Sequence, residues 1–231
     1  MINWTELTKN PIDEIIGVKI LNELKSKRKI NCNQLYRDYL KQEIKNKNVL
    51  DIGVAEHDVI HINRKDWQHK FIVDNSKYCV GVDIIDELVQ LLSSQGYNIK
   101  NVDATSDLYI GETFDVVIIG DVIEHVENPV ALMKFAKRHC SIGGKIIVAT
   151  PNPFFYKNFL QVINTTTFVA NFEHISWITP SMALEIARRS GLEFYEYLFF
   201  IKCKRPFRKI LNTKFPEILN DRLYYVFKNL G

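Results

Sequence analysis

The sequence lacks the features that define several large classes of protein. No apolar run approaches the ~18 residues that a membrane-spanning helix needs. The first ten residues, MINWTELTKN, contain Glu6 and lack the apolar core of a signal peptide. The four cysteines lie far apart and form no C-x-x-C pair that would suggest a zinc site or a redox motif. We therefore expect reduced, mostly buried thiols, no membrane span and a cytoplasmic location.

Glycine is also scarce, with 10 in 231 residues, and the stretch G-x-G-x-x-G is missing. This absence argues against NAD, because the pyrophosphate of a dinucleotide needs those glycines at a helix N-terminus. What is present is ordinary for a globular domain, since 46% of the residues are hydrophobic and 25% are charged. The composition therefore excludes a disordered tail and a collagen-like repeat.

Charge is unevenly distributed along the chain. Residues 1–47 and 202–231 have formal charges of +4 and +6, whereas residues 48–201 carry −7. An acidic middle differs from the continuous basic face of a dedicated nucleic-acid-binding protein. The two basic flanks suit phosphate or an anionic membrane surface, and they equally suit a solvated face of a lysine-rich chain.

The first part of the chain has helical periodicity. Apolar residues recur at three- and four-residue spacings in residues 12–29, which predicts an amphipathic helix, and a second helix is expected in residues 33–45. We interpret residues 1–46 as a small helical N-terminal lid and residues 47–231 as the main domain.

After residue 47 the period changes. Short apolar runs predict strands, and they alternate with helical stretches at 86–96 and 129–140. β-branched runs without alternation are typical of strands buried on both faces, as in a parallel sheet with crossover helices. The fold class is therefore α/β, a Rossmann-like doubly wound sheet, with 222–229 as a final antiparallel strand. The predicted buried strands are 48–52, 79–84, 98–102, 114–120 and 144–150.

Acidic residues end four of these strands. In doubly wound sheets, ligands bind outside the carboxyl ends of the strands. Asp83 can accept hydrogen bonds from both hydroxyls of a ribose, and Asp103 can hold an adenine amino group. Gly53, just after the first strand, lets the backbone come close to a ligand.

Several motifs in this order resemble those of class I S-adenosylmethionine-dependent methyltransferases. They are VLDIG, GVDI, VDAT, FDVVIIGDVIEHVENP, GGKIIVATPNP and HISWITP, and the resemblance covers about residues 47–200. The pattern E-H-x-x-x-P is similar to that of a branch with quinone, small-molecule and glycan O-methyltransferases. The resemblance implies a seven-stranded, mostly parallel sheet and S-adenosylmethionine as cofactor.

The same resemblance implies which residues hold the methyl donor. They are Asp51, Gly53, Val54, Ala55 and Glu56 for the methionine part, Asp83 and Ile84 for the ribose, Asp103 and Ala104 for the adenine, and Gly120 and Asp121 near the sulfonium. This sequence departs from the family by keeping one glycine in the first loop, where Ala55 and His57 occupy the later positions. Glu56 would repel a pyrophosphate but suits a cationic donor.

Methyl transfer to oxygen requires an aligned acceptor and usually a base for its proton. The stretch D-x-x-E-H places Asp121, Glu124 and His125 on about one turn if a helix begins there, and His174 lies in a loop before the helix that starts at Thr179-Pro180. His125 or His174 could serve as the base. Alternatively, Asp121, Glu124, His125 and His174 could hold a divalent metal, which we consider possible but do not expect, or they could be structural.

Other stretches invite functional interpretation. Residues 151–178 are rich in aromatic side chains and are expected to line an acceptor pocket and exclude water, through Phe154, Phe155, Tyr156, Phe159, Phe168 and Phe172. The sequence His57-Asp-Val-Ile-His61 imitates a zinc-protease motif but lacks its Glu and an evident third ligand. Trp67 and His69 either reach into the site or pack in the core.

We interpret the chain as an S-adenosylmethionine-dependent methyltransferase that acts on an oxygen of a small polar metabolite or a sugar, such as a cell-surface polysaccharide intermediate. PNPFF follows the fifth strand rather than the fourth, which argues against methylation of nucleic-acid bases. Two alternatives remain: a non-catalytic nucleotide-binding module, and a terminal-RNA 2′-O-methyltransferase, which the acidic middle disfavours. The sequence does not predict an oligomeric state.

Overall fold

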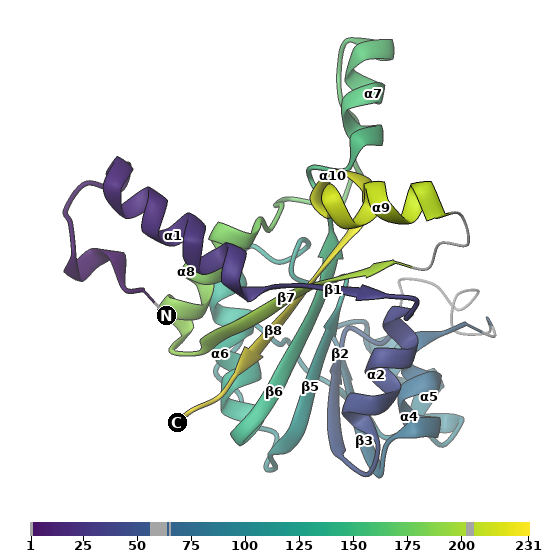
Figure 1. Ribbon diagram of the computed structural model, residues 1–231. Helices are drawn as coiled ribbons and strands as arrows, with labels where there is room; N and C mark the ends of the chain where they lie inside the picture. Colours follow the sequence, from purple (N-terminus) through teal and green to yellow (C-terminus); the bar gives the residue numbers. More distant parts are fainter. Residues whose placement is uncertain (1, 56–63, 65, 202–205) are drawn as a thin grey trace.

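The computed structural model describes residues 2–55, 64, 66–201 and 206–231, with the backbone alone for 206–209. These residues form one eight-stranded sheet in the order β1-β7-β8-β6-β5-β2-β3-β4 (Figure 1). Strand β8 runs antiparallel to β6 and β7, and the other neighbouring pairs are parallel. The strands are β1 (Arg28–Cys32), β2 (Asn48–Ile52), β3 (Tyr78–Asp83), β4 (Ile99–Asn101), β5 (Phe114–Gly120), β6 (Cys140–Pro151), β7 (Glu193–Ile201) and β8 (Arg222–Lys228).

Helices cover both faces of this sheet, which confirms the doubly wound α/β prediction. Apolar residues of α2 and α4 pack on one face, and those of α6 and α8 pack on the other. The helices are η1 (Trp4–Glu6), α1 (Glu14–Lys27), α2 (Tyr36–Ile44), α4 (Gln68–Asn75), α5 (Asp86–Ser94), α6 (Pro129–His139), α7 (Tyr156–Thr165), α8 (Pro180–Ser190), α9 (Pro206–Lys214) and α10 (Pro216–Leu219).

Local sequence signals set where the helices near the site begin. The Asn128 side chain caps α6 by accepting a hydrogen bond from the Ala131 amide at 3.0 Å, and Pro129 follows it. In the same way Thr179 caps α8 with Pro180 next, as the sequence predicted. Both caps hold the preceding loops over the carboxyl edge of the sheet.

The sheet has one strand more than the seven predicted. β1 forms where the sequence pattern continued a helix to residue 29, and β7 arises from a segment for which no strand was predicted. Ile30 is in register with Phe199, so the edge strand β1 obtains its partner from far along the chain. A periodicity within one window cannot show such a partner, which explains the error.

The N-terminal residues pack against two separate regions of the fold, one at α8 and β7 and the other at α4. The Trp4 indole donates to Glu185 of α8 at 3.0 Å, and Lys27 donates to the Phe194 carbonyl of β7 at 2.6 Å, whereas α2 packs beside α4. The role of residues 1–46 as a lid stays a prediction.

Two expectations from composition can be compared with the described part of the chain. None of its helices combines the length and apolar character that a bilayer span requires. Cys79 and Cys140 are buried and Cys32 is exposed, and all three are free thiols.

Candidate active site

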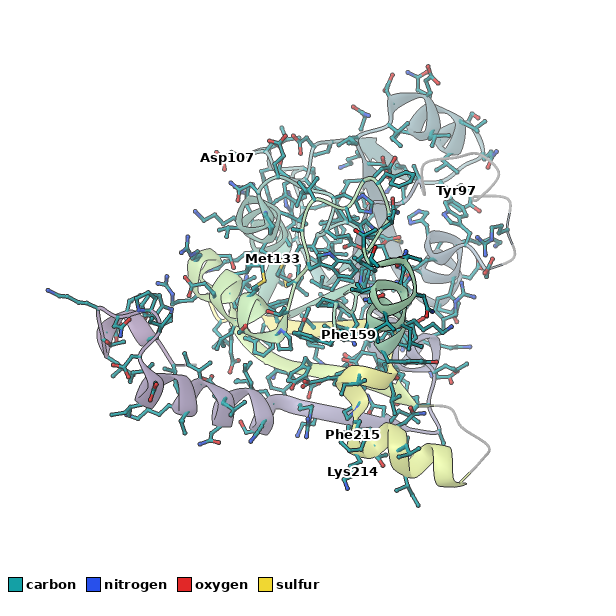
Figure 2. All side chains as sticks on the ribbon, turned by 90° about the horizontal axis from the view of Figure 1, so that it is seen from above. Tyr97, Asp107, Met133, Phe159, Lys214 and Phe215 are labelled. Carbon is teal, nitrogen blue, oxygen red and sulfur yellow. The ribbon has the colours of Figure 1, made fainter. Side chains whose placement is uncertain are left out.

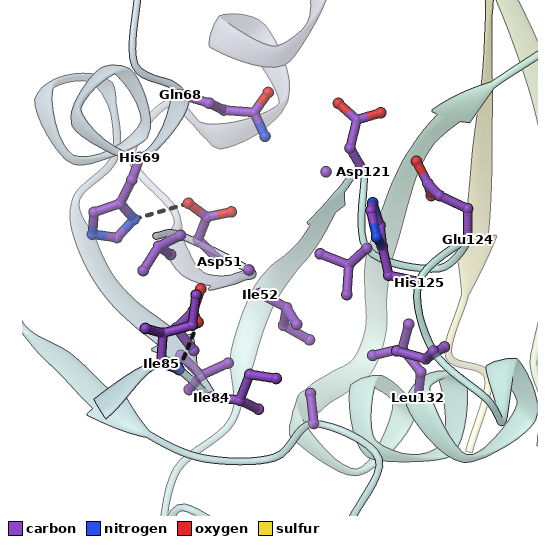
Figure 3. Close-up of a pocket in the computed structure, with 18 of the residues that line it drawn as sticks. Asp51, Ile52, Gln68, His69, Ile84, Ile85, Asp121, Glu124, His125 and Leu132 are labelled. Atoms are coloured by element: carbon purple, nitrogen blue, oxygen red, sulfur yellow. Dashed lines mark hydrogen bonds and ion pairs between the residues drawn. The ribbon is translucent and has the colours of Figure 1, made fainter. Parts of the chain in front are cut away.

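A cavity of about 640 Å³ opens at the carboxyl edge of β2, β3 and β5. This volume lies within the range of ~300–1,000 Å³ that is usual for small-molecule sites. In Figure 3, Asp51 and His69 lie on one side of the cavity, and Asp121, Glu124 and His125 lie on the other. We call these the donor end and the acceptor end.

Asp51 is the buried carboxylate of the donor end. Its Oδ2 accepts a hydrogen bond from His69 Nδ1 at 2.8 Å. Burial raises the pKa of Asp51, and the hydrogen bond from His69 acts in the opposite direction. His69 Nε2 is buried and makes no hydrogen bond. His69 therefore positions Asp51, a role that the sequence left open between packing and function.

The turn after β2 is held by tight contacts. Gly53 has φ +83°, and a Cβ there would lie 2.2 Å from Cγ2 of Val122. The Gly53 amide donates to the Val82 carbonyl at 2.9 Å, and the Trp67 indole donates to the Val54 carbonyl at 2.9 Å. The glycine is thus required by its backbone conformation and by the approach of Val122.

The carboxylates at the ends of β3 and β4 are organised by backbone amides. Asp83 accepts from the Ala55 amide at 2.8 Å and from the Ile85 amide at 3.0 Å, one on each oxygen. Asp103 accepts from the amide and hydroxyl of Thr105, both at 2.7 Å. Each oxygen of Asp83 keeps one lone pair, and Asp103 accepts both of its bonds on Oδ1, which leaves Oδ2, so both groups can still accept hydrogen bonds from a ligand.

The residues predicted to bind the methyl donor line this cavity, except for Ala55 and Glu56. Ala55 does not line it but supports Asp83, and Glu56 lies outside the described residues, as do His57 and His61 of the zinc-protease lookalike. The residues of the prediction that line the cavity are Asp51, Gly53, Val54, Asp83, Ile84, Asp103, Ala104, Gly120 and Asp121.

At the acceptor end, the D-x-x-E-H stretch forms a turn rather than the start of a helix. Asp121 has φ +53°, and α6 begins at Pro129. The condition for a shared helical turn, a helix beginning at Asp121, is not met, because the Asn128 cap and Pro129 place the helix start later. The turn nevertheless brings Glu124 and His125 to the cavity.

Glu124 is the most deeply buried group of this turn, with 1% of its surface exposed. Burial raises its pKa to about 7. Thr150 donates to Oε2 at 3.1 Å, whereas Oε1 makes no hydrogen bond and lies 4.0 Å from His174 Nε2. The Ile175 amide donates to the Glu124 carbonyl at 3.0 Å, so the loop that carries His174 is fixed to this turn.

The two histidines meet edge to face, with ring centroids 4.7 Å apart. His125 Nδ1 lies 3.9 Å from Glu173 Oε2, and partial burial lowers the pKa of His174. Ligand atoms of Glu124, His125 and His174 lie within 4.8 Å of one another, close enough to share a metal ion. Asp121, the fourth ligand considered from sequence, is not part of this group.

Arg222 and Gln68 are among the polar residues of the cavity that were not predicted from the sequence. Arg222, at the start of β8, donates from Nη1 to Asp121 Oδ1 at 2.6 Å, and Gln68 lies so close to Gly120 that a Cβ there would be 2.5 Å from its Nε2. Register Pro151↔Arg222 brings the arginine to the site, and only the folded sheet reveals it.

The sequence profile of a family described as a methyltransferase domain matches residues 24–197, well over half of the chain. The chain belongs to this methyltransferase family. The motif resemblance implies that its methyl donor is S-adenosylmethionine.

Solved structures share the fold of this methyltransferase. A S-adenosylmethionine-dependent methyltransferase from Mesorhizobium loti has a TM-score of 0.56 at 14% identity, covering 82% of this chain and 95% of that one. One from Archaeoglobus fulgidus has a TM-score of 0.54 at 17% identity, covering 83% of this chain and 90% of that one. A Thermotoga maritima protein, described as a possible histamine N-methyltransferase, has a TM-score of 0.54 at 14% identity. The match covers 84% of this chain and 87% of that one.

A relative found by sequence matches a shorter part of the chain. An uncharacterized protein of Methanocaldococcus jannaschii is 33% identical over 69 residues, which are 30% of this methyltransferase and 34% of the relative. The match thus spans about a third of that protein's length.

The donor end fits S-adenosylmethionine. Asp51 and the Gly53 turn line the cavity together with Gly120, and the carboxylates of Asp83 and Asp103 face the same cavity. A carboxylate can accept from an ammonium or from ribose hydroxyls, and the apolar walls Ile84 and Leu132 suit an adenine ring.

The aromatic insert differs from its prediction. None of the six aromatic residues expected to cover the acceptor pocket lines the cavity, and Phe154, Phe159 and Phe172 are exposed. The segment reaches the site through Asn171 and His174 instead. Residues Tyr156–Thr165 of the segment form α7, which stands away from the body (Figure 1).

Proposed function

We propose that this methyltransferase methylates an oxygen of a small polar metabolite or a sugar intermediate, with His174 as the base. The observation that carries the proposal is the cluster of Glu124, His125 and His174 at the acceptor end of the cavity. With Asn171 and Arg222 beside them, these groups form a polar wall that suits hydroxyl-bearing acceptors.

His174 is the better placed of the two candidate bases. Its lowered pKa keeps the imidazole neutral near pH 7, so a ring nitrogen can accept a proton. Glu124 Oε1, 4.0 Å from Nε2, can stabilise the imidazolium once the proton has arrived. S-adenosylmethionine, when bound, supplies the methyl group, and His174 takes the proton that the acceptor hydroxyl loses.

The same cluster supports a variant of the mechanism in which a divalent metal orients the acceptor. Carboxylate and imidazole groups are suitable ligands, and Glu124 Oε1 is buried without a hydrogen bond. Adding Mg²⁺ or Mn²⁺ to EDTA-treated protein separates this variant from proton transfer to His174 alone.

An amine is a second candidate acceptor. The Thermotoga maritima structure is described as a possible histamine N-methyltransferase, and the Glu124 carboxylate could accept a hydrogen bond from an amine. An acceptor panel of sugars, phenols, phosphate esters and amines distinguishes the two. Terminal RNA belongs in the same panel, with salt-dependent filter binding as its readout.

The decisive experiment compares His174→Ala with His125→Ala on the best acceptor of the panel. His174→Ala should lower kcat by about 10²–10⁴-fold with little change in S-adenosylhomocysteine affinity, and His125→Ala should lower it less. Unchanged kcat in His174→Ala would contradict its role as base. Donor binding without turnover on any acceptor would favour a non-catalytic module.

A further inference from the structure

The end of helix α6 holds the loop that connects β4 to β5. Residues 102–113, all of which the structure describes, form neither helix nor strand. Two consecutive residues at the end of α6, Arg138 and His139, make hydrogen bonds to this loop. Asp103 and Thr105 of the same loop line the cavity. The end of α6 is therefore linked, through one loop, to the part of the donor end that is predicted to bind adenine.

His139 binds the loop as a neutral ring with a defined tautomer. Its side chain is buried, and its Nε2 accepts a hydrogen bond from the Ile110 amide at 3.0 Å. Because an amide N–H can only donate, Nε2 carries no proton. The proton of the neutral ring is therefore on Nδ1, which donates to the Phe135 carbonyl at 2.8 Å. One imidazole thus joins the last turn of α6 to Ile110.

Arg138 binds a part of the loop that is closer to the cavity. Its Nη1 donates to the carbonyls of Ser106 and Leu108 at 3.3 and 3.1 Å, and its Nη2 donates to Asp107 Oδ1 at 2.8 Å. Asp107 is fully exposed at the outer edge of the molecule (Figure 2), so the ion pair contributes little and the two carbonyls are the main attachment. Ser106 Oγ donates in turn to the Asp103 carbonyl at 2.7 Å, which continues the connection to the cavity.

We propose that Arg138 and His139 are positioning residues, which hold this loop so that Asp103 meets the adenine half of the methyl donor. The inference rests on the proposed function, with S-adenosylmethionine bound at the donor end. Neither side chain lines the cavity, so each acts through the loop rather than on the ligand. A loop without the hydrogen bonds of a helix or strand depends on such attachments, because ordering its backbone costs conformational entropy.

Protonation of His139 would break its bond to the loop. A proton on Nε2 would point at the Ile110 amide, where two donors would meet. Burial lowers the pKa of His139, the hydrogen bond to the Phe135 carbonyl opposes this, and the positive charges of Arg138 and Lys100 lower it further. The imidazole is therefore neutral at pH 7 and takes up its proton below the ordinary histidine value of about 6.5. As pH falls through that range, the loop loses one attachment.

The other titratable groups around His139 leave this charge without a partner. Asp107 and Glu112 already belong to ion pairs with those two cations, at 2.8 and 3.3 Å. Tyr109 presents its ring to the imidazole, with centroids 5.2 Å apart. Cys140, the next residue in the chain, is a neutral thiol because burial raises its pKa to about 12. An imidazolium here would therefore be both buried and uncompensated.

The test is calorimetric titration of the full chain with S-adenosylhomocysteine and with adenosine. His139→Phe keeps an aromatic ring in the core but leaves the Ile110 amide without its acceptor, so both ligands should bind at least about fivefold more weakly at pH 7.5. Arg138→Met should weaken both by about threefold or more. Lys137→Met is the matched control, because Lys137 donates to the Gly231 carbonyl instead, and it should bind both ligands like the native chain.

The pH profile and a packing variant separate positioning from a purely structural role. Donor affinity of the native chain should have a component that is lost as pH falls below about 6.5. His139→Gln places an Oε1 near the position of Nε2 and takes up no proton in this range, so it should bind like native protein at pH 7.5 and lack that component. Phe135→Leu loosens the same core but keeps the Phe135 carbonyl, so it should lower stability in urea unfolding without changing donor affinity.

Three results would overturn the proposal. They are native affinity in His139→Phe or Arg138→Met, a loss of affinity in Phe135→Leu as large as that in His139→Phe, and a pH profile that is the same in His139→Gln and native protein. In each case, binding by the native chain that Asp83→Ala weakens would leave the assignment of the donor end intact. Absence of binding by the native chain would remove both.

Discussion

The donor end and the acceptor end of the cavity are built in different ways. At the donor end, hydrogen bonds fix each carboxylate, as with Asp83 between the amides of Ala55 and Ile85 and Asp51 beside the His69 ring. At the acceptor end, the groups come from the β5 turn, the loop before α8 and the start of β8, and Glu124 Oε1 is left without a hydrogen bond. The first arrangement suits a constant ligand, and the second leaves polar capacity for an acceptor.

The largest loss of donor affinity and of stability is expected for a substitution in the turn after β2, at the donor end. Gly53→Ala should abolish donor binding and destabilise the fold by about 2–4 kcal/mol, because φ is positive and the new Cβ would meet Val122. Calorimetry and urea unfolding measure both quantities. Gly96→Ala is the matched control, since Gly96 has φ +91° and nothing within 4 Å of a Cβ.

The double variant Gly53→Ala, Val122→Ala separates the two causes. Partial recovery of stability would assign the remainder to backbone strain, and the loss in Gly96→Ala calibrates that strain. If Gly53→Ala costs no more than Gly96→Ala, the close approach to Val122 is not a constraint.

A second effect concerns the buried pair Asp51–His69. His69→Leu leaves Asp51 buried without its hydrogen bond and should cost about 1–3 kcal/mol of stability. His69→Asn retains a donor near the position of Nδ1 and should recover part of this. Because the hydrogen bond lowers the pKa of Asp51, its loss should shift the acid limb of donor binding to higher pH.

The control for this prediction is the pH profile of S-adenosylhomocysteine affinity in both variants. A profile of His69→Leu that coincides with the native one would show that His69 only fills space.

At the acceptor end we expect a pH-dependent effect of comparable or smaller size. The folded pKa of Glu124 is about 7, raised from 4.5, so the unfolded state releases its proton first as pH rises. Stability linked to Glu124 is therefore full below pH ~4.5 and falls until pH ~7. Glu124→Gln should remove this decline and be more stable than native protein at pH 8, by about 1–3 kcal/mol.

Urea unfolding from pH 4.5 to pH 8 checks this prediction. A native-minus-variant difference that stays constant over that interval would mean that Glu124 is ionised in the folded protein throughout.

The smallest effect on stability is expected for Arg222. The ion pair with Asp121 is partly exposed, so Arg222→Met should change the free energy of unfolding by less than about 1 kcal/mol. Because Arg222 lines the acceptor end, KM for the acceptor should rise more than donor affinity falls. An equal loss of donor and acceptor binding would remove the distinction between the two ends.

The difference between the donor end and the acceptor end also explains which parts of the site could be predicted from the sequence. Asp51 and Asp83 lie at the carboxyl ends of β2 and β3, and Gly53 and Asp103 come just after β2 and β4. The pattern of strands therefore already brings them to one edge of the sheet. Arg222 and the strand β1 depend on pairings between distant segments, and neither leaves a signal in a local window. His69 lay in a stretch beyond the motifs, where nothing in the sequence indicates that its Nδ1 faces Asp51.

The most direct test of the account is a calorimetric titration of EDTA-treated protein with S-adenosylhomocysteine, compared with Asp83→Ala. We expect roughly micromolar affinity for the native chain and a loss of at least about tenfold in the variant, because Asp83 accepts from the Ala55 amide and is the residue predicted to bind the ribose. Absence of binding at millimolar ligand, or equal affinity in Asp83→Ala, would contradict the assignment of the donor end.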